Sequence, residues 1–501
     1  MISWSPQQND IFLWVRSPFG SRIVIAVAGS GKTTTLVQCA RLIPEDCQST
    51  FVAFNKHIAD ELTAKLPDTV RSMTLNALGN RAWTKFNAGV RPVLDTKKSW
   101  TIMDEIFNSG DVRMYGAYVN KLVGLAKTVG LVPAKSLEGN MIQIVEDTDD
   151  AWGEIEDRFN VQSESWHDSK KAYDMARKVL DESINRGSMV IDFNDQLYLP
   201  VIFDVDFLRN DWLFVDEAQD VNALQLLMLE KSLKADGHLL AVGDPKQSIY
   251  AFRGADHNAI ETIKERFAAE EMPLTVSYRC PKLVVAEART VFPGAKNLIE
   301  HAPDAEDGVV SELEQWDVTH VNLPRTLILC RNNKPLAELL FRLKVAGVLA
   351  CLKGKDALSG VVALAKKLKP INIDDLGDKL TQHLDKETQK LTRTKQMTKL
   401  ADLNDRAETL RVFIENSDDL VDLGRKLADA AKDSTTGFVT LSTIHKAKGL
   451  EFDNVFILDK WLIPSKWAST PEALIQEDNL LYVAITRAKK QLFYITSEAY
   501  A

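Results

Sequence analysis

Short apolar runs and amphipathic helical stretches alternate through the first half of the chain. Each run is rich in β-branched or apolar residues and is followed by polar or glycine residues, which is typical of strands in a parallel sheet whose functional loops lie at one edge. Alternation of such strands with helices predicts a parallel α/β sheet. The strands are expected at residues 22–27, 50–54, 212–215 and 239–242.

The second half repeats this pattern and predicts a second sheet. Its strands are expected at residues 326–330, 438–442, 455–458 and 491–495, so the expected fold class is α/β with two parallel-sheet cores. Two stretches with few β-branched runs and many Lys, Asp, Glu, Leu and Ala predict mainly helical insertions. The expected division is a first core at residues 1–90 and 195–280 with an insertion at 91–194, and a second core at residues 281–347 and 436–501 with a small insertion at 348–435.

Composition narrows the class of protein. The chain has 501 residues, of which 45% are hydrophobic and 26% charged, and at roughly 100–200 residues per domain this length predicts about three or four domains. Its 61 Lys and Arg against 70 Asp and Glu give a formal charge of −9, which excludes a protein held to nucleic acid by bulk positive charge. Any nucleic-acid contact is therefore expected in a local groove.

The cysteines and the N-terminal residues indicate the cellular compartment in which the protein is expected. The five cysteines are scattered and form no CxxC pair, so neither a disulfide framework nor a zinc or iron–sulfur site is indicated. The first residues have no basic and apolar leader pattern, and no apolar run reaches about 18 residues, so we expect neither secretion nor a membrane-spanning segment. The expected location is the cytoplasm of a bacterial or phage-infected cell, or the nucleus if the chain is eukaryotic.

A phosphate-binding loop is indicated at residues 28–34, Ala-Gly-Ser-Gly-Lys-Thr-Thr. The string follows a predicted strand and opens a predicted helix, the context in which glycines let backbone N–H groups point at phosphate oxygens. Lys32 supplies a point charge to the β- and γ-phosphates, and the Thr33 hydroxyl is a candidate Mg²⁺ ligand. The strict pattern has Gly where Ala26 stands, so an ordinary glycine-rich turn remains the alternative for this string alone.

Two adjacent carboxylates follow the predicted strand at 212–215. In the string Phe-Val-Asp-Glu-Ala-Gln-Asp, Asp216 is the candidate Mg²⁺ ligand and Glu217 the candidate group that polarises the attacking water. Alone, an acidic pair at a strand end is more often a charge at a helix N-terminus, but the phosphate-binding loop favours the catalytic interpretation. The loop after the next strand offers the Gln247 amide as a γ-phosphate sensor.

With these strings in order, the sequence resembles a superfamily 1 DNA helicase of the UvrD/Rep type, and the resemblance extends over both cores. It implies two RecA-like P-loop cores that use ATP and Mg²⁺. Beside the two strings above, it rests on residues 4–8 (WSPQQ) for the Q motif, 51–56 (FVAFNK) for motif Ia, 73–79 (MTLNALG) for motif Ib, 276–279 (VSYR) for motif IV, 443–452 (TIHKAKGLEF) for motif V and 481–488 (LYVAITRA) for motif VI.

The resemblance also implies roles for individual residues. Gln8 reads the adenine, Tyr278 stacks on the base and Glu451 lies near the ribose. Arg279 and Arg487, from the second core, reach the γ-phosphate, with Arg487 as an arginine finger. The expected nucleotide-binding set is Gln8, Ala28, Gly29, Ser30, Gly31, Lys32, Thr33, Thr34, Tyr278 and Glu451; the expected metal ligands are Thr33 and Asp216; the expected catalytic set is Lys32, Asp216, Glu217, Gln247, Arg279 and Arg487.

Movement along a single strand needs a track on which aromatic faces stack bases without regard to sequence. Phe54, Tyr250 and Phe252 are candidates because each lies in a polar loop after a strand, although an isolated aromatic is more often part of a core. Arg253 and His445 are candidates for phosphate contacts, with a structural role as the alternative for the histidine. The expected DNA-binding set is Phe54, Asn55, Thr74, Tyr250, Phe252, Arg253, Thr443 and His445.

Some positions depart from the family pattern. Asn76 replaces the usual motif Ib histidine, Thr34 stands where many members carry arginine, and Asp478 and Asn479 occupy a normally basic pair. The segment 386–399, in which Glu387 is the only acid, is either a solvated helix face or a further nucleic-acid contact. The short second insertion and the string at 352–356 resemble compact phage and F-box-helicase-like relatives.

The resemblance and the residues together predict an ATP-dependent 3′→5′ DNA helicase or translocase that is a monomer in solution. One alternative is a single-strand translocase that displaces bound proteins without separating duplex, and another is a nucleic-acid scaffold that does not hydrolyse ATP. The expected partners are single-stranded DNA, duplex junctions and proteins of replication, repair or recombination.

Overall fold

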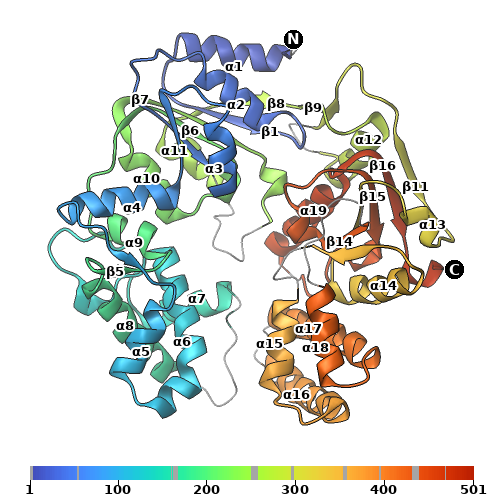
Figure 1. Ribbon diagram of the computed structural model, residues 1–501. Coiled ribbons are helices and arrows are strands. Elements are labelled where there is room, and N and C mark those ends of the chain that lie inside the picture. Colours follow the sequence, from blue (N-terminus) through green and yellow to red (C-terminus); the bar gives the residue numbers. More distant parts are fainter. Residues whose placement is uncertain are drawn as a thin grey trace. The chain divides into compact units, whose positions relative to one another are not determined.

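The computed structural model describes residues 4–53, 56–159, 161, 168–249, 258–294, 298–353, 358–393, 397–430, 439–468 and 470–500. The chain divides into two compact units (Figure 1). The first holds residues 1–26 and 31–274, and the second holds residues 27–30 and 275–501. Each unit is built on one six-stranded sheet, and the strand pairs of both sheets are parallel.

The first sheet has the strand order β3-β2-β6-β7-β1-β8. Its four inner strands are the four expected from the sequence. Its two edge strands, β3 and β8, were not expected, because they carry polar and exposed residues that break the apolar pattern. The strands are β1 Arg22–Ala26, β2 Ser49–Ala53, β3 Val70–Thr74, β6 Asn210–Val215, β7 Leu233–Gly243 and β8 Glu270–Leu274.

Successive residues of the inner strands face opposite sides of the first sheet, as the two-residue period of a strand requires. Phe51, Phe214 and Leu240 join one core, while their neighbours Val52 and Leu213 join the other. Because both faces are covered, the buried stretches of these strands are mainly apolar, which is why their sequences were recognisable. The helices associated with this sheet are α1 Pro6–Arg16, α2 Lys32–Ala40, α3 Lys56–Thr63, α4 Leu75–Phe86, α9 Asp195–Ile202, α10 Ala223–Lys231 and α11 Ala259–Arg266.

The first insertion is mainly helical and continues one of these two cores. It consists of α5 Lys98–Ile106, α6 Ser109–Val129, α7 Asp149–Arg158 and α8 Ser169–Asn185, with α5 and α6 packed on α8, and α6 also packed on α9 (Figure 1). Two short strands, β4 Val93–Leu94 and β5 Val190–Ile191, pair where the insertion leaves and rejoins the sheet unit. The turn after β5 leads directly into α9, so the insertion and the sheet unit share one hydrophobic core.

The second sheet has the order β11-β16-β15-β12-β14-β13. Again the four inner strands were expected and the two edges were not. The edge strand β13 lies inside the stretch 348–435 that the sequence assigned to a helical insertion, because three residues are too few to show a strand period. The strands are β11 Val309–Glu312, β12 Thr326–Cys330, β13 Ala350–Leu352, β14 Val439–Thr443, β15 Phe452–Leu458 and β16 Ala488–Ile495.

Helices of the second unit pack around this sheet and form its insertion. A pair of two-residue strands, β9 Val276–Ser277 and β10 Glu300–His301, lies near the start of the unit. The sheet helices are α12 Lys282–Val291, α13 Val318–Val321, α14 Asn333–Val345 and α19 Pro471–Ile485, and the insertion helices are α15 Ser359–Lys367, α16 Ile373–Arg393, α17 Met397–Glu415 and α18 Leu420–Ala430. The insertion is joined to the sheet through α17, which packs on α14 (Figure 1).

Candidate nucleotide and nucleic-acid sites

The loop between β1 and α2 has the backbone of a phosphate cradle. Gly29 and Gly31 have φ of 74° and 78°, a region that favours glycine because it carries no Cβ. Gly31 is the N-cap of α2 and has no side chain with which to cap the first N–H groups of that helix. Such N–H groups bind anions, and the helix dipole favours negative charge at the same end. The loop therefore fits a nucleotide phosphate.

Thr33 and Asp216 meet beside this loop. The Thr33 hydroxyl donates a hydrogen bond of 2.6 Å to a carboxylate oxygen of Asp216, directly after β6. Burial raises the pKa of Asp216 to about 6, and the neighbouring Glu217 carboxylate adds to the rise, while Thr33 and Lys32 oppose it. A buried carboxylate beside a second carboxylate favours a bound cation, so these residues fit Mg²⁺.

In the described ranges, no group of three or more His, Cys, Asp or Glu side chains is placed to hold a metal ion.

Gln219 connects Glu217 to the loop after β7. Its amide nitrogen donates to the Glu217 carboxylate at 2.5 Å, and its amide oxygen accepts from the backbone N–H of Asp244 at 2.9 Å. Asp244 in turn accepts a 2.6 Å bond from the Gln247 amide. The expected water-polarising residue and the expected γ-phosphate sensor are thus linked through two residues that the sequence analysis did not select, although both lie inside the strings it used.

Gln8 and Thr34 lie on the helices near the phosphate cradle. The Gln8 amide donates to the Thr35 hydroxyl at 2.9 Å and accepts from the backbone N–H of Ser5, so it caps α1 and ties it to α2. Thr34 is exposed on α2.

The second-unit residues expected at the nucleotide contact one another. Arg279 forms an ion pair with Glu451 and donates to the Thr486 carbonyl at 3.2 Å. Burial opposes ionisation of Glu451, but Arg279 outweighs it and holds the pKa of Glu451 below its ordinary value. The ring of Tyr278 is half exposed. Within this unit, the Tyr278 N–H also donates to the Gly29 carbonyl at 2.9 Å.

Arg487 is 1% exposed. Its guanidinium donates to the carbonyl oxygens of Val483 and Leu450, at 2.9 and 3.3 Å, and to the Thr486 hydroxyl at 3.2 Å. The resemblance implied a phosphate contact for this side chain, and in the structure its donors are directed at the backbone and a hydroxyl of its own unit.

The expected DNA-binding residues are only partly within the described chain. Phe54, Asn55, Tyr250, Phe252 and Arg253 lie outside the described residues. Thr74 is the N-cap of α4, where its hydroxyl accepts from the Ala77 N–H at 3.2 Å. Thr443 ends β14, and His445 lies in the short 3-10 helix Ile444–Ala447 that follows.

The basic segment 386–399 spans the end of α16 and the start of α17, and the structure leaves residues 394–396 undescribed. Glu387 and Lys399 are both buried, so this segment also contributes to the helical core of the insertion.

Asn76 and Phe193 form a contact that the sequence analysis missed. The Asn76 amide donates to the Phe193 carbonyl at 2.8 Å and to the Gln196 side chain at 3.1 Å. The Phe193 ring, in the turn between β5 and α9, is 56% exposed. Part of the signal was present, because Phe193 is an aromatic residue beside polar ones, but the strand β5 before it was not expected from the sequence.

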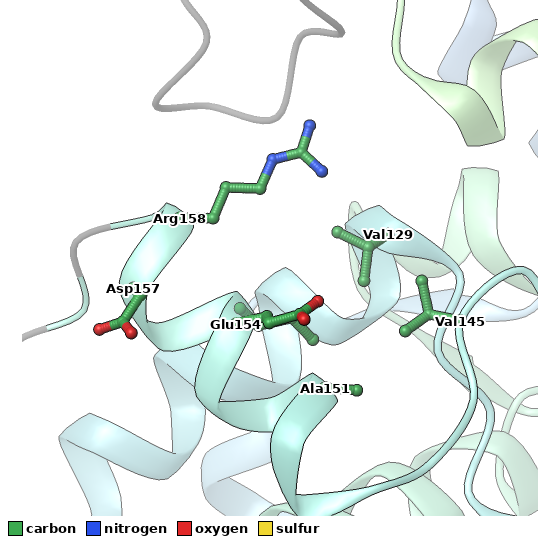
Figure 2. Close-up of a pocket in the computed structure, with 7 residues that line it drawn as sticks. Val129, Val145, Ala151, Glu154, Asp157 and Arg158 are labelled. Atoms are coloured by element: carbon green, nitrogen blue, oxygen red, sulfur yellow. The ribbon is translucent and has the colours of Figure 1, made fainter. Parts of the chain in front are cut away.

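A separate cavity of about 350 Å³ lies in the first insertion. Figure 2 shows Glu154 and Arg158 along α7, with Val129 and Val145 on neighbouring segments. None of the expected site residues lines it. In the described part of the chain, no helix is both long and apolar enough to span a bilayer.

Comparison with known families and proteins gives a consistent result. The UvrD/REP helicase N-terminal domain matches residues 4–268, and the UvrD-like helicase C-terminal domain matches residues 353–499. The F-box DNA helicase protein 1 of Schizosaccharomyces pombe is 25% identical over 516 residues, covering 94% of this chain and 55% of that protein. A probable DNA helicase II homolog of Mycoplasma genitalium is 25% identical over 407 residues, covering 60% of this chain and 58% of that protein.

A third relative is the ATP-dependent DNA helicase UvrD2 of Mycobacterium tuberculosis, 27% identical over 325 residues, which cover 56% of this chain and 46% of that protein. The chain thus spans about half the length of the curated relatives it matches. The crystal structure of an arterivirus nonstructural protein 10 (helicase) aligns with 97% of this chain and 61% of that chain at 12% identity, but its TM-score of 0.34 adds nothing to the family assignment.

Proposed function

Because the chain belongs to the UvrD-like helicase family, we propose that it is an ATP-dependent DNA helicase that moves 3′→5′ along single-stranded DNA and separates duplex. The observation that carries the proposal is the bond between Thr33 and Asp216 beside the phosphate cradle. It brings together the two oxygen ligands that a nucleotide-bound Mg²⁺ would take from this chain. When bound, Mg²⁺ would neutralise charge on the phosphates.

Different residues of the first unit bind the ATP phosphates, hold the attacking water and respond to the γ-phosphate. Lys32 and the N–H groups at the start of α2 bind and orient the phosphates. Glu217 holds the attacking water, and its bond to Gln219 fixes the carboxylate in place. Gln247, linked to the same network through Asp244, responds to the γ-phosphate.

The second unit contributes the cationic side chains. In our proposal Arg279 and Arg487 stabilise the negative charge that develops on the γ-phosphate, Tyr278 stacks on the adenine, and Glu451 contacts the ribose. Arg279 forms an ion pair with Glu451, and in our proposal nucleotide binding exchanges this ion pair for phosphate and ribose contacts. Arg487 must likewise exchange backbone partners for phosphate.

The single strand is proposed to run past motif residues of both units. Support in the first unit comes from Phe193, whose ring is exposed and whose carbonyl accepts from Asn76 in the N-terminal turn of α4. Base–aromatic stacking contributes about 1–3 kcal/mol per base and tolerates any sequence. We therefore add Phe193 to the eight expected DNA-binding residues. The 3′→5′ direction rests on the likeness of the motif V string to the UvrD/Rep branch.

The test is ATP hydrolysis measured with and without a single-stranded oligonucleotide, with Lys32→Ala as the inactive control. The proposal predicts hydrolysis that the oligonucleotide stimulates and that Lys32→Ala abolishes. A chain that binds the oligonucleotide but hydrolyses no ATP would instead be a nucleic-acid scaffold.

A further inference from the structure

Four charged side chains are clustered in the interior of the first unit, and none of them serves the proposed ATP chemistry. Lys127 and Asp195 are fully buried, and Lys98 is nearly so. Lys127 donates to Asp192 at 2.6 Å and forms an ion pair with Asp195 at 2.7 Å, and Lys98 donates to Asp195 at 2.7 Å. Both lysines also bond to Ser183, one to its hydroxyl and the other to its carbonyl.

A buried cluster of charges is a weak source of stability for a protein core. Removing ammonium and carboxylate groups from water opposes folding, and well-packed apolar side chains of the same volume often stabilise a protein as well or better. Burial opposes ionisation of Asp195, but Lys127 and Lys98 outweigh it and hold its pKa below the ordinary value. Burial lowers the pKa of Lys98, and Asp195 opposes that fall. The placement of this cluster calls for a role other than stability.

The two aspartates flank one short turn. Asp192 and Asp195 also bond to each other's backbone, since each N–H donates to the other carboxylate, at 3.0 and 2.8 Å. Between them, the Asn194 amide donates to the Gly124 carbonyl at 3.2 Å, and the Phe193 carbonyl accepts from Asn76. Every residue of the turn is thus fixed to a helix, and its exposed apolar side chain is the ring of Phe193.

We infer that Lys127 and Lys98 are positioning residues for nucleic-acid binding: through Asp192 and Asp195 they hold the turn that presents Phe193 to a base of the bound strand. The lysines come from α5 and α6 of the insertion, whereas Asn76 comes from the motif Ib helix α4. The insertion thereby fixes one base-stacking element of the sheet unit. This inference rests on the proposed function, because it requires a bound single strand.

The test combines cluster variants with Phe193→Ala and measures affinity for a labelled oligo-dT by fluorescence anisotropy, without nucleotide. Lys127→Met is expected to weaken binding by about fivefold to a hundredfold, the range that loss of one stacked base implies. In the Phe193→Ala background the same substitution is expected to weaken binding no further, because its effect passes through that ring.

Two further variants keep the test decisive if Lys127→Met folds poorly. Asp192→Asn removes a partly exposed charge but keeps an acceptor for the Asp195 N–H, and it is expected to weaken binding in the same Phe193-dependent way. Arg177→Met is the matched control, because it removes an ion pair of the same insertion, with Asp147 at 2.7 Å, and is expected to leave oligo-dT affinity unchanged. Amide hydrogen exchange gives a readout independent of DNA: Lys127→Met should speed exchange at residues 192–196 and not in α2.

The outcomes separate the inference from the proposed function. If Phe193→Ala weakens binding while Lys127→Met and Asp192→Asn do not, or if they weaken it equally with and without the Phe193 ring, the positioning role is wrong and the proposed function stands. A wild-type protein that binds no oligo-dT would overturn both.

Discussion

A hydrogen bond of 2.6 Å joins the side chains of Thr33 and Asp216, which lie 183 residues apart in the sequence. The bond is made at the carboxyl edge of the first sheet, where only β7 separates β1 from β6. The loop that follows β7 carries Asp244 and Gln247 and is bonded to Gln219. One edge of one sheet therefore holds the candidate phosphate cradle, the expected metal ligands and the expected water-polarising residue.

Lys32→Ala and Glu217→Gln are expected to abolish turnover by different routes. Lys32 binds phosphate through its charge, whereas Glu217 acts on water after ATP is bound. The Glu217→Gln variant should therefore still bind both ATP and single-stranded DNA. Nucleotide titrations beside steady-state hydrolysis check this, and an equal loss of ATP affinity in both variants would contradict the assigned roles.

Gln219→Ala is expected to slow hydrolysis by about tenfold to a hundredfold with little change in ATP affinity. The amide holds the Glu217 carboxylate at 2.5 Å, and misplacing a catalytic group by about 1 Å can cost a factor of about 10² in rate. The measurement is kcat and the ATP dissociation constant of the same preparation. Should ATP affinity fall and kcat stay unchanged, Gln219 would be a binding residue.

Arg487→Ala is expected to lower both stability and turnover. The buried guanidinium is hydrogen-bonded to Val483, Leu450 and Thr486 inside the second unit, so its loss should reduce the free energy of unfolding by about 2–5 kcal/mol. Hydrolysis per folded molecule should fall by about 10³-fold, as for arginine fingers. Thermal melting and DNA-stimulated hydrolysis are measured together, and near-normal turnover of the folded variant would make Arg487 purely structural.

The ionisation of Asp216 predicts a pH dependence of stability. Burial raises its pKa to about 6, so the folded protein binds this proton more tightly than the unfolded chain does. The resulting stability is present below about pH 4 and is lost as the pH rises through about 6. Relative to Asp216→Asn, the free energy of unfolding of the ligand-free protein should fall by about 3 kcal/mol across this window. Parallel profiles for the two proteins would contradict the raised pKa.

The sequence predicted the inner strands of both sheets and none of the edges. Inner strands are buried on both faces and read as continuous apolar runs, whereas β3, β8 and β11 carry charged or polar residues, and β13 has only three residues. Contiguous strings made the phosphate loop and the acidic pair recognisable. The contact of Asn76 with Phe193 was not recognisable in the sequence. It joins residues 117 positions apart, and the turn that contains Phe193 takes its place only in the folded insertion.

The central claim is that the protein uses ATP to separate DNA strands in one direction. The most direct test is an unwinding assay on duplexes that carry either a 3′ or a 5′ single-stranded tail. We predict that the protein separates a duplex with a 3′ tail in the presence of ATP and Mg²⁺, that Lys32→Ala does not, and that a duplex with only a 5′ tail remains paired. Unwinding of the 5′-tailed duplex alone would contradict the direction, and hydrolysis without separation of either duplex would contradict the helicase activity.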